Sequence, residues 1–230
     1  MKKRKFCLFI LILLIILGLT GCQSKNENIE MEKGLSEVRF LENRWVSILG
    51  KYISGEYETK NGNLDWELIR EDYVILNQSV EVILIDFASL QIPSKTIAQL
   101  EKNFNDLNIF LQNNDIESFM KLVCDSYDLV ANSILNDLSI DKTLKQEKIL
   151  KSKMLYIGYY IAVSNKEEAF HYLNDFEENY ISLSKNKNYI DSNSYKINRI
   201  LVEVQKLKYW LEKDNFENGK EEFFKILQEL

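Results

Sequence analysis

Beyond residue 30, apolar side chains recur at alternating intervals of three and four residues. An α-helix has about 3.6 residues per turn, so this spacing places the apolar side chains on one helix face that must be buried. The longest stripe covers eight positions, from Trp66 to Leu90. Further stripes cover residues 38–52, 97–111, 116–134, 150–161, 169–183 and 197–211. The pattern therefore predicts an all-α fold.

Residues that favour helix starts and ends separate the stripes. A polar loop runs from Gly55 to Gly62, and Pro93 pushes the residue before it out of the helical region. Between residues 80 and 85 branched aliphatic residues would suit a strand, but the stripe continues through them and favours a helix. The predicted caps are Asn63, Asp115 in the turn 113–115, Ser164 with Glu167, and Asp214 with Glu217.

These elements predict an antiparallel multi-helix bundle of seven or eight helices over residues 31–230. Three apolar triplets, at residues 109–111, 159–161 and 209–211, recur every fifty residues, and each precedes a polar turn. Such an echo is expected of a short solenoid of helical hairpins. Amphipathic hairpins of similar length also produce echoes by themselves, so the pattern leaves both arrangements open.

The first 22 residues have the layout of an export signal. Residues 2–5 are four cations, and residues 6–19 are a run of fourteen apolar residues or glycines. This run is shorter than the about 18 residues that a membrane-spanning helix needs, and it fits a secretory signal. It ends in Leu19-Thr20-Gly21-Cys22, which resembles the lipobox of bacterial lipoproteins. An uncleaved signal anchor with an incidental cysteine is the alternative.

The resemblance implies diacylglyceryl transfer to the Cys22 sulfur and cleavage between Gly21 and Cys22. It divides the chain into a signal peptide (1–21), a lipidated tether (22–30) and a helical domain (31–230). Two acyl chains suffice for stable anchoring, so the expected location is the cell membrane, facing outside the cytoplasm. Cys7 would leave with the signal and Cys22 would be acylated, which leaves Cys124 without a disulfide partner.

Charge limits the partners that the domain is expected to bind. Removing the four cations of residues 2–5 from the chain's 29 leaves 25 Lys+Arg against 35 Asp+Glu, a formal charge of −10. Nucleic-acid binding depends on neutralising phosphates, so an acidic domain argues against that class of partner. The membrane contact is expected through the lipid on Cys22.

No group of residues in the sequence predicts catalysis. His171 is the only histidine, whereas a di-iron site needs two Glu-x-x-His motifs, so we expect a surface histidine and no metal or cofactor. Cys124 lies beside Asp125 without a nearby histidine base, so we expect it to pack in the core. Neighbouring acidic residues on a helix point about 100° apart and do not converge on one atom. A carboxylate-using enzyme or metal-handling protein on a helical bundle is the alternative to a non-enzymatic domain.

Aromatic residues are the best candidates for binding. Tyr156, Tyr159 and Tyr160 lie close together and, with Gly158, could line a groove. Aromatic anchors often dominate the free energy of binding at an interface, and Tyr159, Tyr160 and Trp210 lie off the apolar stripes. The sequence therefore predicts an anchored interaction module for a protein partner or cell-envelope component. The alternative is that these aromatic residues fill a second interface inside the fold.

The lipobox generates the first testable prediction. Replacing the acceptor thiol in Cys22→Ala should abolish lipidation, because no other cysteine lies at the predicted cleavage site. Metabolic labelling with a fatty acid measures the modification directly, with Cys7→Ala as the matched control that keeps its label. Label persisting on the Cys22→Ala variant would rule out the assignment.

Overall fold

The structure, a computed structural model, describes residues 32–138 and 140–230. The predicted signal peptide, Cys22 and the tether lie outside these residues. The described residues form helices and no β-strand; a single isolated bridge joins Glu58 to Leu64. The predicted all-α fold is confirmed, and the segment 80–85 is helical as expected. The elements are a helix over residues 32–54 (the N-terminal helix), α2 (Trp66–Ser89), α3 (Ser94–Gln112), α4 (Ile116–Leu129), the π-helix η1 (Val130–Ile134), α5 (Leu135–Asp137), α6 (Lys142–Ala162), α7 (Lys166–Leu183), α8 (Lys187–Glu212) and α9 (Phe216–Glu229).

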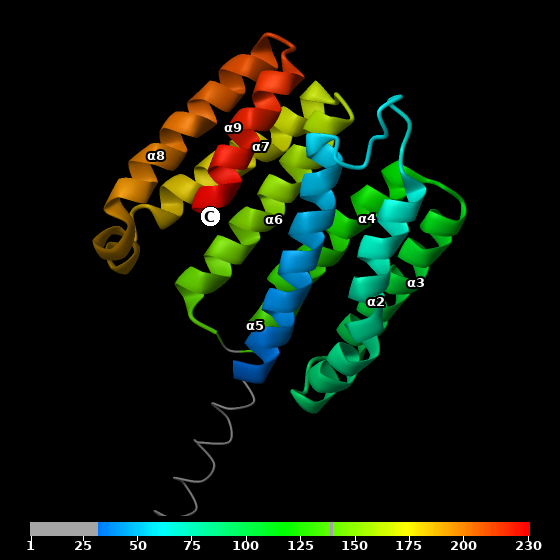
Figure 1. The fold of residues 1–230 in the computed structure, drawn as a ribbon. Coiled ribbons are helices and arrows are strands. Elements are labelled where there is room, and N and C mark those ends of the chain that lie inside the picture. Colours follow the sequence, from blue (N-terminus) through cyan, green and yellow to red (C-terminus); the bar gives the residue numbers. More distant parts are fainter. Residues whose placement is uncertain (1–31, 139) are drawn as a thin grey trace, which may run out of the picture.

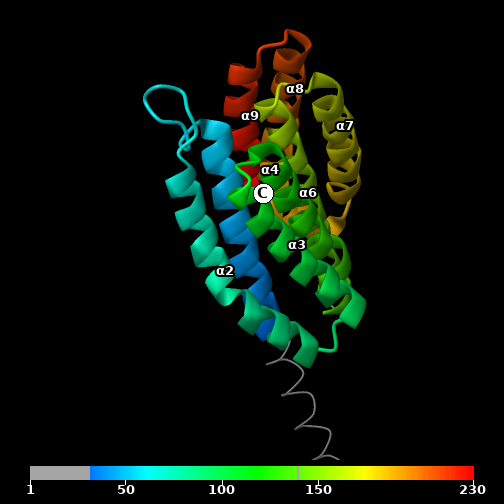
Figure 2. The same cartoon turned by 90° about the vertical axis from the view of Figure 1, so that its right-hand side faces the viewer.

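Helices that follow one another in the chain run in opposite directions, and they stand in a row with α8 and α9 at one end and α2 and α3 at the other (Figure 1). The view at right angles shows that this row is more than one helix deep, because the helices spread from α2 on the left to α7 on the right (Figure 2). In the middle, α6 packs against α4, α7 and α9. The core is continuous along the row, since the buried apolar residues form one cluster from Val38 to Ile226.

The second helix of each hairpin starts at a capping residue, and these caps are spaced by fifty residues. Each cap accepts a hydrogen bond from the backbone N–H three residues on, which satisfies one donor of the first turn. The four caps are Asp65, Asp115, Asn165 and Asn215. Of the predicted caps, Asp115 is confirmed, whereas Asn63, Ser164 and Asp214 are wrong by one or two residues.

The last three hairpins share one turn conformation. Asn114, Ser164 and Asp214 have φ of 54°, 55° and 53°, the left-handed conformation that ends many helices. In each turn the cap's N–H bonds to the carbonyl five residues earlier, at 2.9, 2.8 and 3.0 Å. Ser164 and Asp214 therefore occupy the turn position and leave capping to the following asparagine.

Buried positions in α3, α6 and α8 repeat at the same interval. The apolar stripes of these helices align over four positions, all of them buried. The aligned sets are Leu100, Leu150 and Ile200; Phe104, Met154 and Val204; Leu107, Ile157 and Leu207; and Leu111, Ile161 and Leu211. The fifty-residue echo thus corresponds to a repeated structural unit, a helical hairpin with a fixed turn.

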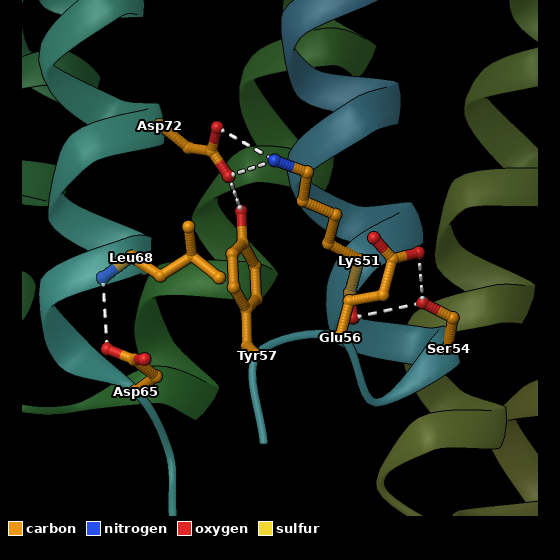
Figure 3. Close-up of polar contacts among 7 residues, drawn as sticks. All are labelled: Lys51, Ser54, Glu56, Tyr57, Asp65, Leu68 and Asp72. Atoms are coloured by element: carbon orange, nitrogen blue, oxygen red, sulfur yellow. Dashed lines mark hydrogen bonds and ion pairs between the residues drawn. The ribbon is translucent and has the colours of Figure 1, made fainter. Parts of the chain in front are cut away.

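Polar contacts attach the N-terminal helix to its neighbours. The buried phenol of Tyr57 donates a 2.7 Å hydrogen bond to Asp72 of α2, and Lys51 Nζ donates to both Asp72 oxygens at 2.9 and 2.7 Å (Figure 3). On another side, Lys148 and Lys151 of α6 donate to the carboxylate of Glu42 at 2.5 and 2.8 Å. Although burial alone would raise the pKa of Glu42, the two lysines hold this pKa below its usual value.

Gly158 of α6 lies where the N-terminal helix and α9 both approach. A Cβ atom at this position would lie 2.5 Å from the Phe223 ring and 2.6 Å from Ile53. Both neighbours are fully buried, so neither can move aside without disturbing the core. A glycine is needed here because of this close approach.

The close approach at Gly158 leads to a stability prediction. Gly158→Ala should lower the free energy of unfolding by about 1–3 kcal/mol, because an overpacked core must shift to make room. Chemical denaturation of the purified protein measures the change. Gly50→Ala is the matched control: its Cβ would lie 3.8 Å from Phe224, an ordinary contact, so the helix-favouring alanine should be neutral or stabilising. Equal losses in both variants would contradict the packing argument.

Candidate partner-binding site

The outer face of α8 exposes a regular line of side chains, which we call the α8 seam. Tyr195, Val202 and Tyr209 are spaced by seven residues, and Asn198 and Gln205 lie between them; all five are exposed. Steps of three and four residues keep a line of side chains on one helix face, which is the geometry by which one helix packs against another. A large exposed apolar patch on a folded domain often marks an interaction site.

A shallow, mainly apolar groove of about 850 Å³ runs along this seam. One wall is aromatic: the rings of Tyr209 and Trp210 meet edge to face at 4.9 Å, and Lys213 lies over the Tyr209 ring at 5.9 Å. The groove is lined by Asn198, Leu201, Val202, Gln205, Lys206, Tyr209 and Trp210 of α8 and by Glu222 of α9. Apolar surface next to a few polar groups can bury a partner's side chains and orient them.

The repeated hairpin shows why this face is open. The positions of α6 that correspond to Val202 and Tyr209, fifty residues earlier, are Ser152 and Tyr159. Exposure is 1% and 8% at the α6 positions, against 53% and 50% on α8. Both α6 positions are buried, and Ser152 donates a 2.7 Å hydrogen bond to Asp128 of α4. A position that a neighbouring helix covers in the middle of the row is thus open at its end.

Two buried carboxyl groups lie beneath the groove, one from each helix of the last hairpin. Glu203 of α8 and Glu222 of α9 are both nearly buried, and each accepts a hydrogen bond from a lysine of its own helix, Lys206 and Lys225. Burial and the neighbouring Glu203 carboxyl group raise the pKa of Glu222, whereas the interactions with Glu222 and Lys206 lower the pKa of Glu203. Of the two carboxyl groups, Glu203 therefore loses its proton first as pH rises.

The structure separates the three aromatic residues that the sequence singled out. Trp210 is half-buried and lines the groove on α8. Tyr160 is half-buried on α6 and stacks on Tyr172 of α7 at 5.6 Å. Tyr159 is buried and contacts the Tyr160 ring at 5.1 Å. Tyr160 and Trp210 also occupy the same position before their hairpin turns, where the backbone carbonyl of each accepts a hydrogen bond from the capping residue.

Sequence reasoning missed Val202, Tyr195 and Tyr209. Their seven-residue spacing is visible in the sequence, but it runs beside the buried stripe of α8 and gives no sign of which line faces solvent. Gly158 is packed in the core and lines no groove, contrary to the sequence-based suggestion. His171 is exposed and Cys124 is fully buried, both as expected, and burial raises the pKa of the Cys124 thiol.

A polar recess of about 450 Å³ lies between α3, α4 and α6. Its polar side chains are bonded to one another: Tyr156 donates to Asp125 at 2.5 Å, and Asn103 donates to Ser126 at 3.1 Å. The Tyr156 ring stacks on Tyr172 at 4.6 Å. These contacts join α4, α6 and α7. The side chains of the recess therefore stabilise the packing of these helices.

The raised pKa of Glu222 generates a pH prediction. A raised carboxyl pKa means that the folded state binds the proton more tightly, so this stabilisation is present at low pH and is lost as pH rises through the folded pKa. Glu222→Gln cannot ionise, so it keeps a hydrogen-bond donor beside Glu203 at every pH. The unmodified protein should therefore lose stability relative to this variant as pH rises through the pKa of Glu222. Urea denaturation at several pH values measures the difference, and exposed Glu221→Gln is the control. A constant difference at all pH values would contradict the raised pKa.

Comparison of the chain with protein-family models, with curated proteins and with solved structures gives no match. Over residues 32–138 and 140–230, none of the helices is long and apolar enough to cross a membrane. The same residues contain no group of three or more His, Cys, Asp or Glu side chains arranged to hold a metal ion. The α8 seam and its groove are therefore interpreted from this chain's own residues.

Proposed function

We propose that this protein is a lipid-anchored lipoprotein outside the cytoplasm whose helical domain binds a protein partner through the α8 seam. The observation that carries the proposal is the open apolar face at one end of the row, whose counterpart in α6 is buried against a neighbouring helix. Leaving two tyrosines and a valine in water on one face is unfavourable unless a partner covers them.

A helix is the partner element that this seam fits best. The side chains of the seam follow the three-and-four spacing of helix-to-helix packing, and the groove beside them is long and shallow. Tyr209 and Trp210 supply large apolar surfaces with few rotatable bonds, so little side-chain entropy is lost when they are covered. Lys206 and Gln205 at the edge can orient the partner through polar contacts.

The anchor supports this function by its position in the chain. Ten residues of sequence separate Cys22 from residue 32, where the described domain begins. Ten residues reach at most about 35 Å even when fully extended, so a lipid on Cys22 would keep the domain close to the membrane surface. A domain of formal charge −10 is repelled from anionic lipid, so the seam stays available to proteins.

Photo-crosslinking in living cells tests the docking face. A photoreactive amino acid at Tyr209 or Val202 should give a discrete protein adduct, whereas the same probe at Ile181, exposed on α7, should not. Adducts of equal strength at all three positions, or at none, would contradict the proposal.

Alanine substitution separates binding from folding. Tyr209→Ala removes an exposed ring, so the free energy of unfolding should change by less than about 0.5 kcal/mol while the adduct formed from Val202 weakens. Tyr159→Ala removes a buried ring and should cost about 3 kcal/mol. Thermal and chemical unfolding measure both. If Tyr209→Ala destabilises as much as Tyr159→Ala, the ring belongs to the core and not to a binding face.

A further inference from the structure

A second line of exposed side chains lies on α2, and we call it the α2 seam. Its six members follow alternating steps of four and three residues, so they lie along one face of the helix. The members are Glu67, Glu71, Val74, Gln78, Glu81 and Ile85, and all six are exposed. Ile75 and Val82 flank the line and are exposed as well. No described helix therefore covers this face of α2.

The aliphatic side chains of this face form an uncovered apolar surface. Val74, Ile75, Val82 and Ile85 are between 40% and 68% exposed. A shallow groove of about 680 Å³ opens along the first turns of α2, and Val74 and Ile75 line it. Grouped apolar residues on the surface of a folded domain often mark an interaction site. An open, shallow groove suits the side chains of another protein better than it encloses a small molecule.

Three glutamates give the α2 seam a negative charge that no neighbour neutralises. Glu67, Glu71 and Glu81 have no ion pair with any residue that the structure describes. The two aspartates of the same helix differ, because Asp72 and Asp86 each accept a hydrogen bond from a lysine of the N-terminal helix. The paired acidic groups of α2 thus stabilise the fold, and the unpaired ones lie on the exposed face.

The single basic side chain of α2 is engaged elsewhere. Arg70 donates a hydrogen bond to the Leu111 carbonyl at 3.3 Å and another to Asn114 Oδ1 at 2.6 Å, at the turn between α3 and α4. Its guanidinium also lies over the Trp66 ring, 5.8 Å from the centroid. These contacts direct the arginine toward the α3–α4 turn, so the charge of the seam stays available to a partner.

We propose that the α2 seam binds a basic amphipathic helix of a protein partner. The three-and-four spacing suits packing of one helix on another, with the partner's apolar side chains covering the aliphatic residues of α2. Lysine or arginine side chains of the same partner helix pair with the three glutamates. The surface is separate from the α8 seam, so this inference goes beyond the proposed function and does not depend on it.

The same charge disfavours the other occupants of an exposed helix face. Three uncompensated glutamates repel anionic lipid and nucleic acid, both of which present phosphate groups. A second copy that presented its own α2 seam would bring like charges together. A helix that carries both positive charge and apolar side chains satisfies the whole face.

Site-specific photo-crosslinking to a synthetic peptide tests this inference. The full-length protein carries a photoreactive amino acid at Val82 and is held in nanodiscs of phosphatidylcholine, which has no net charge. The probe is a peptide as long as α2, with leucines at three-and-four spacing and lysines at the remaining positions. Illumination should give one adduct, of the mass of the protein plus one peptide. Far less adduct should form with the photoreactive group at Ile181, which is exposed on α7.

Removal of the charge tests the part played by the three glutamates. The variant Glu67→Gln/Glu71→Gln/Glu81→Gln should need about tenfold more peptide for half of the maximal adduct, because each exposed charge pair adds a small attraction. Added salt should weaken binding to the unmodified protein and have less effect on the variant. The three side chains are exposed, so an unchanged melting temperature is expected and verifies the fold.

A matched variant removes the same charge from other surfaces. Glu167→Gln/Glu178→Gln/Glu221→Gln changes three exposed positions on α7 and α9. This variant should bind the peptide within about twofold of the unmodified protein, because salt screens distant charges. An equal loss in both triple variants would show attraction to the overall charge of the domain and would overturn the site on α2.

The remaining outcomes also overturn the inference. Equal adduct with a peptide of the same composition in scrambled order would show that helix packing has no part in binding. Equal adduct with a peptide that carries glutamates in place of lysines would remove the charge argument. A product at twice the monomer mass without peptide would identify a second copy as the occupant, and a product with phosphatidylcholine would identify the membrane. Absence of any adduct at Val82 would reject the α2 site and leave the α8 seam, which is probed at Tyr209 and Val202, untouched.

Discussion

The close approach of three helices at Gly158 is the constraint on which the layout of the molecule depends. With no side chain at this position, α6 receives Phe223 of α9 and Ile53 of the N-terminal helix at its surface. These contacts bring together residues that are far apart in the sequence: Ile53 near the start of the domain, Gly158 in the middle and Phe223 near the end. The other helices then lie to either side of this centre, with α8 and α9 at one end of the row and α2 and α3 at the other (Figure 1).

Ion pairs hold the N-terminal helix in this arrangement. Glu42 binds two lysines of α6, Asp72 of α2 binds Lys51, and Asp86 of α2 binds Lys33 at 2.6 Å. A largely buried ion pair adds little net stability, because desolvation offsets its attraction, but loss of one partner leaves a costly unpaired charge. These contacts therefore specify one position for the helix more than they strengthen the fold.

A row of repeated hairpins has a direct consequence for function. The hairpins pack on one another, and the N-terminal helix of the first hairpin also contacts α6 and α9. The outer face of α8 in the last hairpin stays exposed and carries the α8 seam. The binding surface that we propose thus arises where no further hairpin covers α8. It needs no catalytic group and no metal ligand.

The sequence by itself determined the helices and their repeat, because apolar spacing and capping are local properties. It located the helical stripes, the echo at fifty residues and the turn at Asn114. It placed two caps one residue early, at Ser164 and Asp214, because a serine or aspartate suits a cap as well as a left-handed turn, and it placed a third two residues early, at Asn63. Only the tertiary structure decided which faces are covered. Tyr159 and Tyr209 hold the same place in their hairpins, yet one is buried and the other exposed. The difference arises from the neighbouring helix, whose position depends on contacts between residues far apart in the chain, and no local pattern records it.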